Sequence, residues 1–340
     1  MKRFKWLLVL MLSIAIAGCG TNGTNGSNES NGAANNGGTA GAAETETPAA
    51  ANNDAAGTSR TIEHAMGSVT LEKKPERVVV LFNGMVDITV ALGVKPVGAV
   101  ESWDQQPWYE FLRDKMTGVE NLGDENQPNI EAIIALKPDL IIGTKTRDEK
   151  IYPQLEAIAP TIITEEVFDW KENMKLSAQA LYMEEEAGKL LADWDQRVAD
   201  FKQKAGDRLA STEASVIRFE KDGSARFYAT GFAGTIFKEL GIGRPQAQMV
   251  EGKAVVNITS KEQMEQLDGD YIFDITQIKE DEPSRAAAQT EWTSHPLWAS
   301  LKGVKNGKYI KVDVVTWNLS AGVLAANSML DDLYEYFELK

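Results

Sequence analysis

Cysteine and histidine are nearly absent from this chain of 340 residues. Cys19 is the only cysteine, and His64 and His295 are the only histidines. A single cysteine cannot form a disulfide within its own chain. A protein that coordinates zinc or manganese directly needs three or four converging ligands from histidine, cysteine and carboxylate side chains. The composition therefore excludes an internal disulfide framework and a three-histidine metal centre.

Motifs of the common catalytic and nucleotide-binding folds are also missing. Residues 318–322, Asn-Leu-Ser-Ala-Gly, come near a nucleophile elbow but lack its first glycine. Gln246 stands where a dinucleotide fingerprint beginning at Gly241 would need its third glycine, and no phosphate-binding loop is present. We therefore expect neither catalysis nor a resident cofactor, and an enzymatic or purely structural role remains the alternative.

Basic residues are outnumbered by acidic ones, 35 to 50, and the formal net charge is −15. A strongly acidic chain is repelled by nucleic acid and by anionic lipid headgroups. We expect no nucleic-acid partner. An anionic ligand would need a local cluster of arginine or lysine to overcome the overall field.

The N-terminus carries an export signal. Three basic residues within positions 2–5 precede an apolar run at 6–17, which is too short to span a bilayer comfortably. Residues 16–19, Ile-Ala-Gly-Cys, match the processing box of bacterial lipoproteins. We predict a signal peptide at 1–18 and lipid attachment at Cys19; an N-terminal membrane anchor with an incidental cysteine is the alternative.

Residues 20–59 contain no lysine, arginine, aromatic residue, leucine, isoleucine or valine. Such a segment cannot bury enough apolar surface to offset the entropy of ordering it. We predict a lipid-anchored flexible tether over 19–59. The folded body then lies on the outer face of the cytoplasmic membrane, in a Gram-positive-like envelope.

The remaining residues alternate short apolar runs with helical patterns, which is typical of α/β domains. Strands are expected at 77–82, 97–100, 140–142 and 161–163, and again at 215–219, 255–256, 271–274 and 309–312, with a closing helix near 319–338. Between the two sets, residues 184–205 repeat apolar side chains at helical spacing. We predict two Rossmann-like α/β lobes, at 60–169 and 210–340, joined by a helical spine over 170–209, with a ligand cleft between them.

Two distant stretches, 129–142 and 260–273, share one plan. In each, an N-cap residue (Asn129 or Ser260) stands two places before a glutamate (Glu131 or Glu262), and an apolar helix pattern leads through a turn into a strand. A second pair, 88–94 and 236–242, ends in Leu-Gly followed by an apolar residue. The repeats indicate two similar lobes.

These motifs, together with ALGVKPVGAVE, PNIEAIIALKPDLIIG and SKEQMEQLDGDYIF, resemble iron-siderophore substrate-binding lipoproteins of ABC importers, in the class with a helical backbone between lobes. The resemblance covers residues 60–340. It implies a monomer that captures a ferric siderophore and delivers it to a permease with its ATPase for iron uptake. The stretch VIRFEKDGSARFYATGFAGTIFKELG is most similar to the hydroxamate and citrate-hydroxamate branch. Haem, cobalamin and catecholate siderophores remain alternative ligands for the same fold.

A siderophore saturates its own iron, so the protein needs no direct metal ligand. It needs basic side chains, above all bidentate guanidinium groups, to bind anionic oxygens, and aromatic rings to pack against the body of the chelate. Such groups are expected on loops at the carboxyl ends of strands, where open α/β sheets bind ligands. The predicted ligand-binding residues are Asn83, Met85, Trp103, Lys145, Arg147, Trp170, Arg218, Arg226, Tyr228 and Trp317.

Arg218 and Arg226 flank a turn, and its length decides whether they act together. A two-residue turn would send them to opposite faces, whereas a three-residue loop at 221–223 with a left-handed Gly223 would pair them on one face. We favour the paired arrangement. Either arginine could instead be an ordinary surface residue, and Glu220 could occupy Arg218.

Glu131 and Glu262 fall in the first turns of the repeated helices, where the helix dipole favours acidic side chains. The family resemblance implies that each glutamate meets arginines of the permease. Favourable helix starts alone would explain either glutamate, but they explain the matched pair less well.

Overall fold

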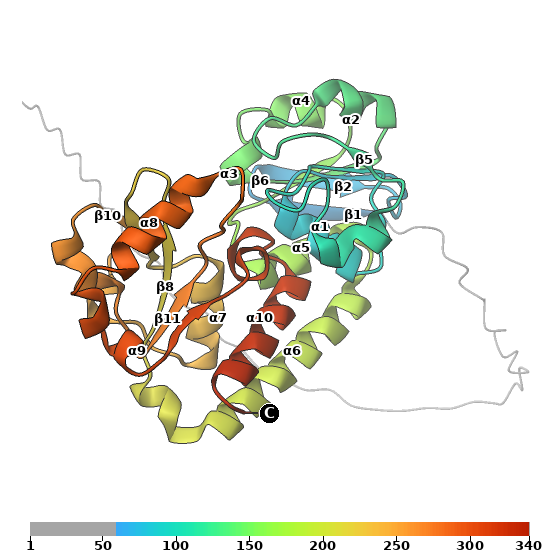
Figure 1. Ribbon diagram of the computed structural model, residues 1–340. Helices are drawn as coiled ribbons and strands as arrows, with labels where there is room; N and C mark the ends of the chain where they lie inside the picture. Colours follow the sequence, from blue (N-terminus) through green and yellow to red (C-terminus); the bar gives the residue numbers. More distant parts are fainter. Residues whose placement is uncertain (1–58, 340) are drawn as a thin grey trace, which may run out of the picture. The chain divides into compact units, whose positions relative to one another are not determined.

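A computed structural model describes residues 59–339 of the chain (Figure 1). The predicted signal peptide, Cys19 and the tether up to residue 58 lie outside the described residues. Within residues 59–339, no helix is long and apolar enough to cross a membrane. This part of the chain carries hydrophobic cores of its own, which is the usual condition for independent folding.

The N-terminal lobe is built on a parallel five-stranded sheet in the order β5-β4-β3-β6-β7. All three valines of β3 are buried, as expected for a central strand covered on both faces. A separate antiparallel hairpin of β1 and β2 precedes it. The strands are β1 (Arg60–His64), β2 (Gly67–Leu71), β3 (Val78–Val80), β4 (Gly98–Ala99), β5 (Glu120–Asn121), β6 (Leu140–Thr144) and β7 (Thr161–Thr164). The helices are α1 (Asn83–Ala91), η1 (Glu110–Met116), α2 (Ile130–Leu136), α3 (Lys145–Asp148) and α4 (Tyr152–Glu156).

The C-terminal lobe has a mixed five-stranded sheet in the order β10-β9-β8-β11-β12, in which β9 runs antiparallel to both neighbours. Its strands are β8 (Ala214–Phe219), β9 (Ala225–Tyr228), β10 (Val255–Ile258), β11 (Tyr271–Asp274) and β12 (Tyr309–Lys311). Its helices are α7 (Phe232–Leu240), η3 (Gln246–Gln248), η4 (Lys261–Leu267), α8 (Pro283–Thr293), η5 (Trp298–Ser300), α9 (Lys302–Lys305), η6 (Val315–Leu319) and α10 (Val323–Tyr336). The closing helix predicted near 319–338 is α10, which begins only at Val323, after the π-helical turn η6.

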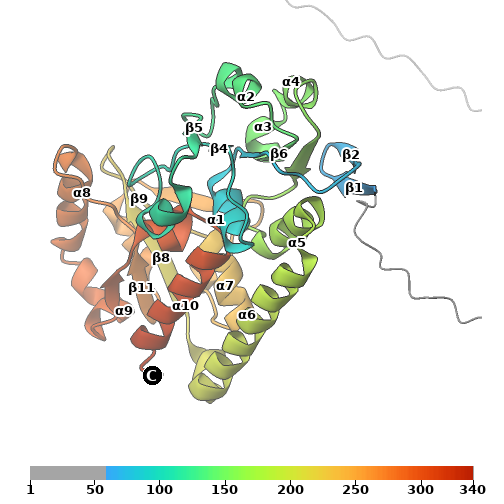
Figure 2. The same ribbon diagram turned by 90° about the vertical axis from the view of Figure 1, so that its right-hand side faces the viewer.

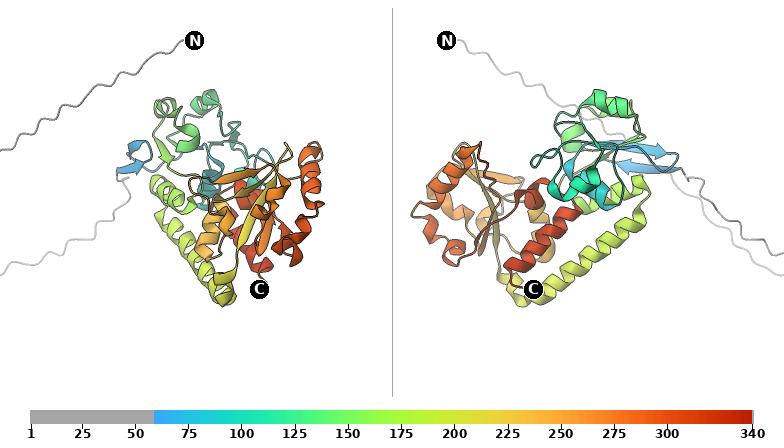
Figure 3. Two further views of the ribbon diagram at one scale, coloured as in Figure 1. Left: turned by 90° about the vertical axis from the view of Figure 1, so that its left-hand side faces the viewer. Right: turned by 45° about the vertical axis from the view of Figure 1, so that its right-hand side comes forward.

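The connection between the lobes is helical, as predicted. After α5 (Trp170–Leu181), the helix α6 covers Glu184–Ala205 and is followed by the 3-10 turn η2 (Gly206–Ser211). Three glutamates in the first turn of α6 and two lysines in its last turn complement the helix dipole. Figures 2 and 3 show α6 extending from the N-terminal lobe to the C-terminal lobe, with α10 beside it.

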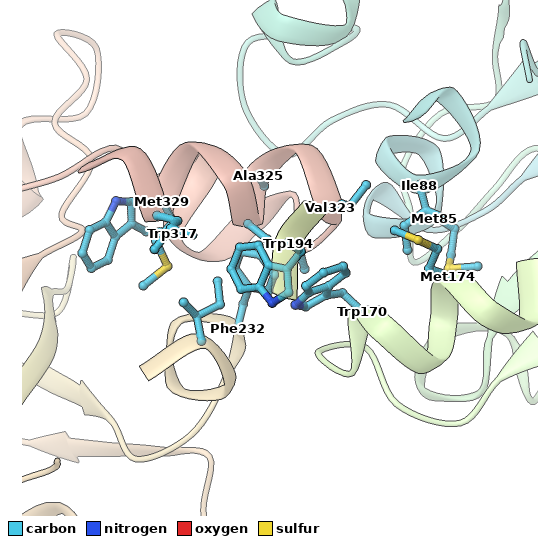
Figure 4. Packing of buried hydrophobic residues seen from close by; sticks show 14 of the residues in the cluster. Met85, Ile88, Trp170, Met174, Trp194, Phe232, Trp317, Val323, Ala325 and Met329 are labelled. Atoms are coloured by element: carbon cyan, nitrogen blue, oxygen red, sulfur yellow. The ribbon is translucent and has the colours of Figure 1, made fainter. Parts of the chain in front are cut away.

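One hydrophobic core runs through both lobes (Figure 4). Met85 on α1 belongs to the same buried cluster as Phe232 and Trp317 of the C-terminal lobe. At its middle, Trp170 and Trp194 pack edge to face with ring centroids 5.1 Å apart. Because packed side chains link α1, the spine and α10, the structure opposes large hinge motions between the lobes.

The repeated segments occupy equivalent places. The Asn129 side chain accepts a hydrogen bond from the Ala132 amide at 3.0 Å, and Ser260 accepts one from the Glu262 amide at 3.3 Å, so both are the predicted N-caps. The first segment forms the α-helix α2, whereas the second forms the tighter 3-10 helix η4.

Candidate ligand-binding site

The hairpin of β8 and β9 places Arg218 directly opposite Arg226. The Glu220 amide donates to the Ser224 carbonyl at 2.8 Å and closes a three-residue loop at 221–223. Gly223 within this loop has a φ of +83°, in the left-handed region that glycine adopts without strain. The predicted pairing of the two arginines on one face is confirmed.

Glu220 stands at the centre of an arginine cluster, which comprises Arg218, Arg226 and Arg285. The Glu220 Oε1 atom pairs with the Nε atom of Arg218 and lies 2.7 Å from the Nε atom of Arg226. The Nη2 atom of Arg285 lies 3.7 Å from Oε2 of the same carboxylate. Arg285 also lies 3.7 Å from the carboxylate of Glu282, which in turn pairs with Lys221. Three arginines and one lysine therefore face two carboxylates, and the cluster keeps an excess of positive charge.

Sequence reasoning missed Arg285, which lies in the first turn of α8. No turn pattern ties this helix to the β8–β9 hairpin, so only the tertiary fold brings it near Glu220. Its Nε atom is buried and has no hydrogen-bond partner among the described residues. The cluster therefore holds a donor that the protein leaves unused.

Tyr228 lies at the edge of the arginine cluster. Its side chain is buried, and the Arg218 guanidinium carbon lies 6.0 Å from the centroid of its ring. Burial raises the pKa of the Tyr228 phenol, and the charges of Arg218 and Arg226 oppose that rise. The phenol is therefore protonated at neutral pH and can donate a hydrogen bond.

A second group forms on the N-terminal lobe around the buried Glu125. Its Oε1 atom accepts from the Arg147 Nε atom at 2.9 Å, and its Oε2 atom accepts from the Asn83 amide and side chain at 2.9 and 2.7 Å. The Arg147 guanidinium lies 6.0 Å from the Trp103 ring centroid, and Trp103 is 40% exposed. An exposed tryptophan beside a fixed arginine offers a flat platform next to a cation.

Asp148, beside Arg147, is a buried carboxyl with unusual titration. Its Oδ2 atom accepts from the Thr144 amide at 2.8 Å, while its Oδ1 atom is buried without a hydrogen-bond partner among the described residues. Burial raises the pKa of Asp148 to about 7, and the charge of Glu125 adds to this effect.

Loops from the two lobes also contact each other directly. The Asp104 carboxylate lies 2.9 Å from the Lys279 ammonium and also accepts a hydrogen bond from Gln277. Asp104 follows β4 and Lys279 follows β11, so carboxyl-end loops of both sheets come together here. This is the edge at which α/β sheets bind ligands.

Three other predicted residues do not reach the surface. Met85, Trp170 and Trp317 are each at most 2% exposed and belong to the shared core. Large apolar side chains after strands can turn inward under the neighbouring helices, and these three do so. Lys145 remains on the surface and pairs with Glu165 at 2.7 Å. Trp194 and Trp298 are also buried.

Among residues 59–339, no group of three or more histidine, cysteine or acidic side chains could hold a metal ion. The charged and aromatic side chains at the meeting loops suit a bulky anion with flat parts. Comparisons with known proteins identify the family. Residues 78–315 match the family model described as periplasmic binding protein.

The chain belongs to this family of binding proteins. It is 43% identical over 285 residues to the probable siderophore-binding lipoprotein YfiY of Bacillus subtilis, covering 82% of this chain and 87% of that one. It is 33% identical to the achromobactin-binding periplasmic protein of Dickeya dadantii, covering 76% and 85% of the two chains. The crystal structure of Staphylococcus aureus SirA complexed with staphyloferrin B superposes with a TM-score of 0.78 at 40% identity, covering 83% and 99%.

The predicted family and the two-lobed fold with a helical connection are thereby confirmed, and the chain is a binding protein rather than an enzyme. Glu131 and Glu262, the predicted permease contacts, are both exposed in the first turns of α2 and η4. Neither carboxylate forms an ion pair or a side-chain hydrogen bond with another described residue. Both remain available to a partner.

Proposed function

We propose that this protein captures a ferric siderophore with a net negative charge and delivers it to an ABC permease. The observation that carries the proposal is the arginine cluster, in which Arg218, Arg226 and Arg285 surround the carboxylate of Glu220. Arg285 also pairs with Glu282, whose charge Lys221 offsets. The cluster keeps unpaired guanidinium donors on a chain whose overall charge is −15. Such a local excess of cations suits carboxylate or catecholate oxygens at the outside of a chelate.

The ligand-binding face that we propose spans both lobes. The C-terminal lobe supplies the arginine cluster and the phenol of Tyr228, and the N-terminal lobe supplies Arg147 and Trp103. Asn83 supports this face from beneath by holding Glu125, and Lys145 lies at its margin. We leave Met85, Trp170 and Trp317 out of the face because the core encloses them.

Charge also bears on the class of siderophore. Three hydroxamate groups neutralise Fe³⁺, so a tris-hydroxamate complex carries no excess charge for three arginines to bind. A chelate with carboxylates keeps a net negative charge. The similarity to SirA, whose crystal structure contains staphyloferrin B, favours an anionic chelate of that kind over the hydroxamate branch. Haem would need an axial ligand, and the only tyrosine of the proposed face, Tyr228, is 7% exposed.

A fluorescence titration tests the proposal. Residues 60–340 would be titrated with ferric staphyloferrin B, a neutral ferric tris-hydroxamate, a ferric catecholate, haem and cobalamin, following tryptophan quenching. We expect saturable submicromolar binding of ferric staphyloferrin B and binding of the neutral hydroxamate at least a hundredfold weaker. Equal or tighter binding of the neutral complex would restore the hydroxamate assignment. Failure of every ferric complex to bind would overturn the function.

We further propose that lipid on Cys19 and the tether at 19–59 hold the protein, as a monomer, at the outer face of the cytoplasmic membrane. Mass spectrometry of the protein from its native membrane would detect a diacylglycerol adduct on Cys19. Replacement of Cys19 by alanine should release the protein from the cell surface into the medium. Retention of the alanine variant at the membrane would favour an uncleaved N-terminal anchor.

A further inference from the structure

A pocket of about 640 Å³ opens in the C-terminal lobe. It lies between the helix α7 and the segment 244–251 that follows it. Its apolar wall includes Phe237, Ile242, Met249 and Val250. The volume falls within the range of ~300–1,000 Å³ that is common for small-molecule sites. None of the residues of the proposed ferric-chelate face lines this pocket.

Arg244 brings an uncompensated charge into the pocket. Its Nη1 atom donates to the backbone carbonyl of Tyr228, while its Nη2 atom is buried and has no hydrogen-bond partner among the described residues. No carboxylate within residues 59–339 forms an ion pair with it. Burial lowers the pKa of Arg244 to about 10, so the guanidinium is still charged at neutral pH. A charge that is desolvated without a partner carries a free-energy cost, and an anion in the pocket would remove that cost.

Gln248 presents the complementary group, an unused acceptor. Its Nε2 atom donates to the Gln266 carbonyl at 2.9 Å and lies 2.6 Å from Ser215 Oγ. Because a carbonyl can only accept, this contact fixes the orientation of the amide. The Oε1 atom of Gln248 is consequently an acceptor, and it is buried without a partner among the described residues.

Glycine at position 234 makes room for the guanidinium. A Cβ atom there would lie 2.9 Å from the Nη2 atom of Arg244, a distance shorter than the contacts that Cβ atoms make in proteins. Two other charges, Lys238 and the exposed Glu251, also line the pocket, and neither forms an ion pair with a described residue. With Arg244, the lining therefore carries one net positive charge.

We propose that this pocket binds a small amphipathic carboxylate. The carboxylate accepts from Arg244 Nη2, a hydroxyl or N–H group next to it donates to Gln248 Oε1, and the apolar body lies against Phe237, Met249 and Val250. The site shares no lining residue with the ferric-chelate face, although Arg244 contacts the backbone of Tyr228, and it does not depend on the proposed function.

Calorimetric titration of residues 60–340 with 3-hydroxydecanoate, decanoate and decanol tests the proposal. We expect saturable binding of one 3-hydroxydecanoate per chain, weaker binding of decanoate and the weakest binding of decanol. Arg244→Met should weaken 3-hydroxydecanoate at least tenfold and leave decanol unchanged. Because Arg244→Met could disturb folding, Gly234→Ala and Thr235→Trp, which crowd the pocket from α7, should produce the same loss.

Controls separate this site from the rest of the protein. Arg113→Gln, which removes an exposed arginine that pairs with Glu110 on η1, should bind 3-hydroxydecanoate like the wild type. Thr235→Trp, which leaves the hydrogen bond from Arg244 to Tyr228 in place, should still bind the ferric chelate that the wild type binds. Arg226→Ala should keep carboxylate binding while losing the chelate. Absence of saturable binding by the wild type, or binding of decanol as tight as that of 3-hydroxydecanoate, would overturn the proposal. So would carboxylate binding that survives all three pocket variants.

Discussion

Asp104 of the N-terminal lobe and Lys279 of the C-terminal lobe form an ion pair across the two lobes, with 2.9 Å between Oδ1 and Nζ. Trp103 precedes this aspartate in sequence, and the loop with Lys279 leads into the helix of Arg285. The pair therefore holds together the loops from which both halves of the proposed ligand face project.

Lys279→Ala should affect ligand release more than stability. Lys279 is 39% exposed and Asp104 16% exposed in their side chains, and pairs of this kind contribute about 0–1 kcal/mol to the free energy of unfolding. We expect a melting temperature close to that of the wild type and a several-fold faster dissociation of the ferric chelate in stopped-flow fluorescence. Lys175→Ala, which removes an exposed pair with Glu172, is the matched control. Identical dissociation rates in both variants would show that the bridge has no part in retention.

Removal of arginines from the cluster should weaken binding of the ferric chelate. The double variant Arg218→Ala, Arg226→Ala leaves Arg285 between the carboxylates of Glu220 and Glu282, so the cluster loses its positive excess. We expect at least a tenfold rise in Kd, equivalent to about 1.4 kcal/mol or more. Titration of the variant at several salt concentrations should also show a flatter dependence on ionic strength. An unchanged Kd would remove the arginines from the site.

Arg285→Ala provides a separate test, because only the tertiary structure identifies this residue. Its loss removes the unused Nε donor together with one positive charge. We expect a Kd raised about tenfold, with an unchanged circular dichroism spectrum. Arg113→Ala is the matched control for loss of one positive charge elsewhere on the chain. If both variants raised the Kd equally, Arg285 would act through the overall electrostatic field of the protein and not through contact with the ligand.

The glutamates Glu131 and Glu262 should be dispensable for ligand capture and required for uptake. Neither is paired within the described residues, so the double alanine variant should fold and bind the ferric chelate normally. Cells that rely on this protein should nevertheless lose uptake of radiolabelled iron. Glu265→Ala, on the exposed side of η4 next to Glu262, is the matched control and should keep uptake. Full uptake by the double variant would show that the two glutamates only stabilise the first turns of their helices.

The buried Asp87 should make stability depend on pH. Its Oδ1 atom accepts from the Leu324 amide at 2.8 Å and its Oδ2 atom accepts from the Ala325 amide at 3.0 Å, so α1 caps α10 across the lobes. Burial raises the pKa of Asp87 to about 6 from 3.8. The folded state therefore holds this proton more tightly than the unfolded state. The contribution of Asp87 to the free energy of unfolding is fully present below pH 3.8 and is lost as the pH rises through 6.

Urea unfolding of the wild type and of Asp87→Asn between pH 4 and pH 7 measures this contribution. The free energy of unfolding of the wild type should rise relative to that of the variant as the pH falls, by up to about 3 kcal/mol. Asp148 titrates in the same direction, and Asp148→Asn isolates its share. A difference between wild type and Asp87→Asn that is constant from pH 4 to pH 7 would contradict this assignment.

Local sequence patterns predicted features that local chemistry determines. The Asp222-Gly223 turn predicted the pairing of Arg218 with Arg226, because loop length and a left-handed glycine set hairpin register. The predicted helix at 184–205 has the bounds of α6, since its apolar spacing is continuous and acidic residues mark its start. The repeated segments also share a hydrogen bond that the sequence pattern did not predict. Asp139 and Asp270 each accept a hydrogen bond from a backbone amide just before the first sheet strand of their lobe.

The sequence alone could not predict features that depend on contacts between distant segments. Arg285 looks like any arginine near a helix start, and only folding places it beside Glu220. Trp170 and Trp317 follow predicted strands as binding residues would, but the core shared by the lobes takes up their side chains. A β-hairpin at residues 60–71 also went unpredicted, because its exposed, polar strands lack the apolar run that marked the others.

The core that runs through both lobes has a consequence for how such a protein diversifies. Trp170, Trp194 and Trp317 contribute to one buried cluster from three parts of the chain. Recombination that exchanged one lobe for that of a relative would have to match all of these contacts at once. Point substitutions in the loops that carry Trp103, Arg147 and the arginine cluster leave the core intact. In this architecture, substitution in loops is therefore the route to new ligand preferences that leaves the shared core undisturbed.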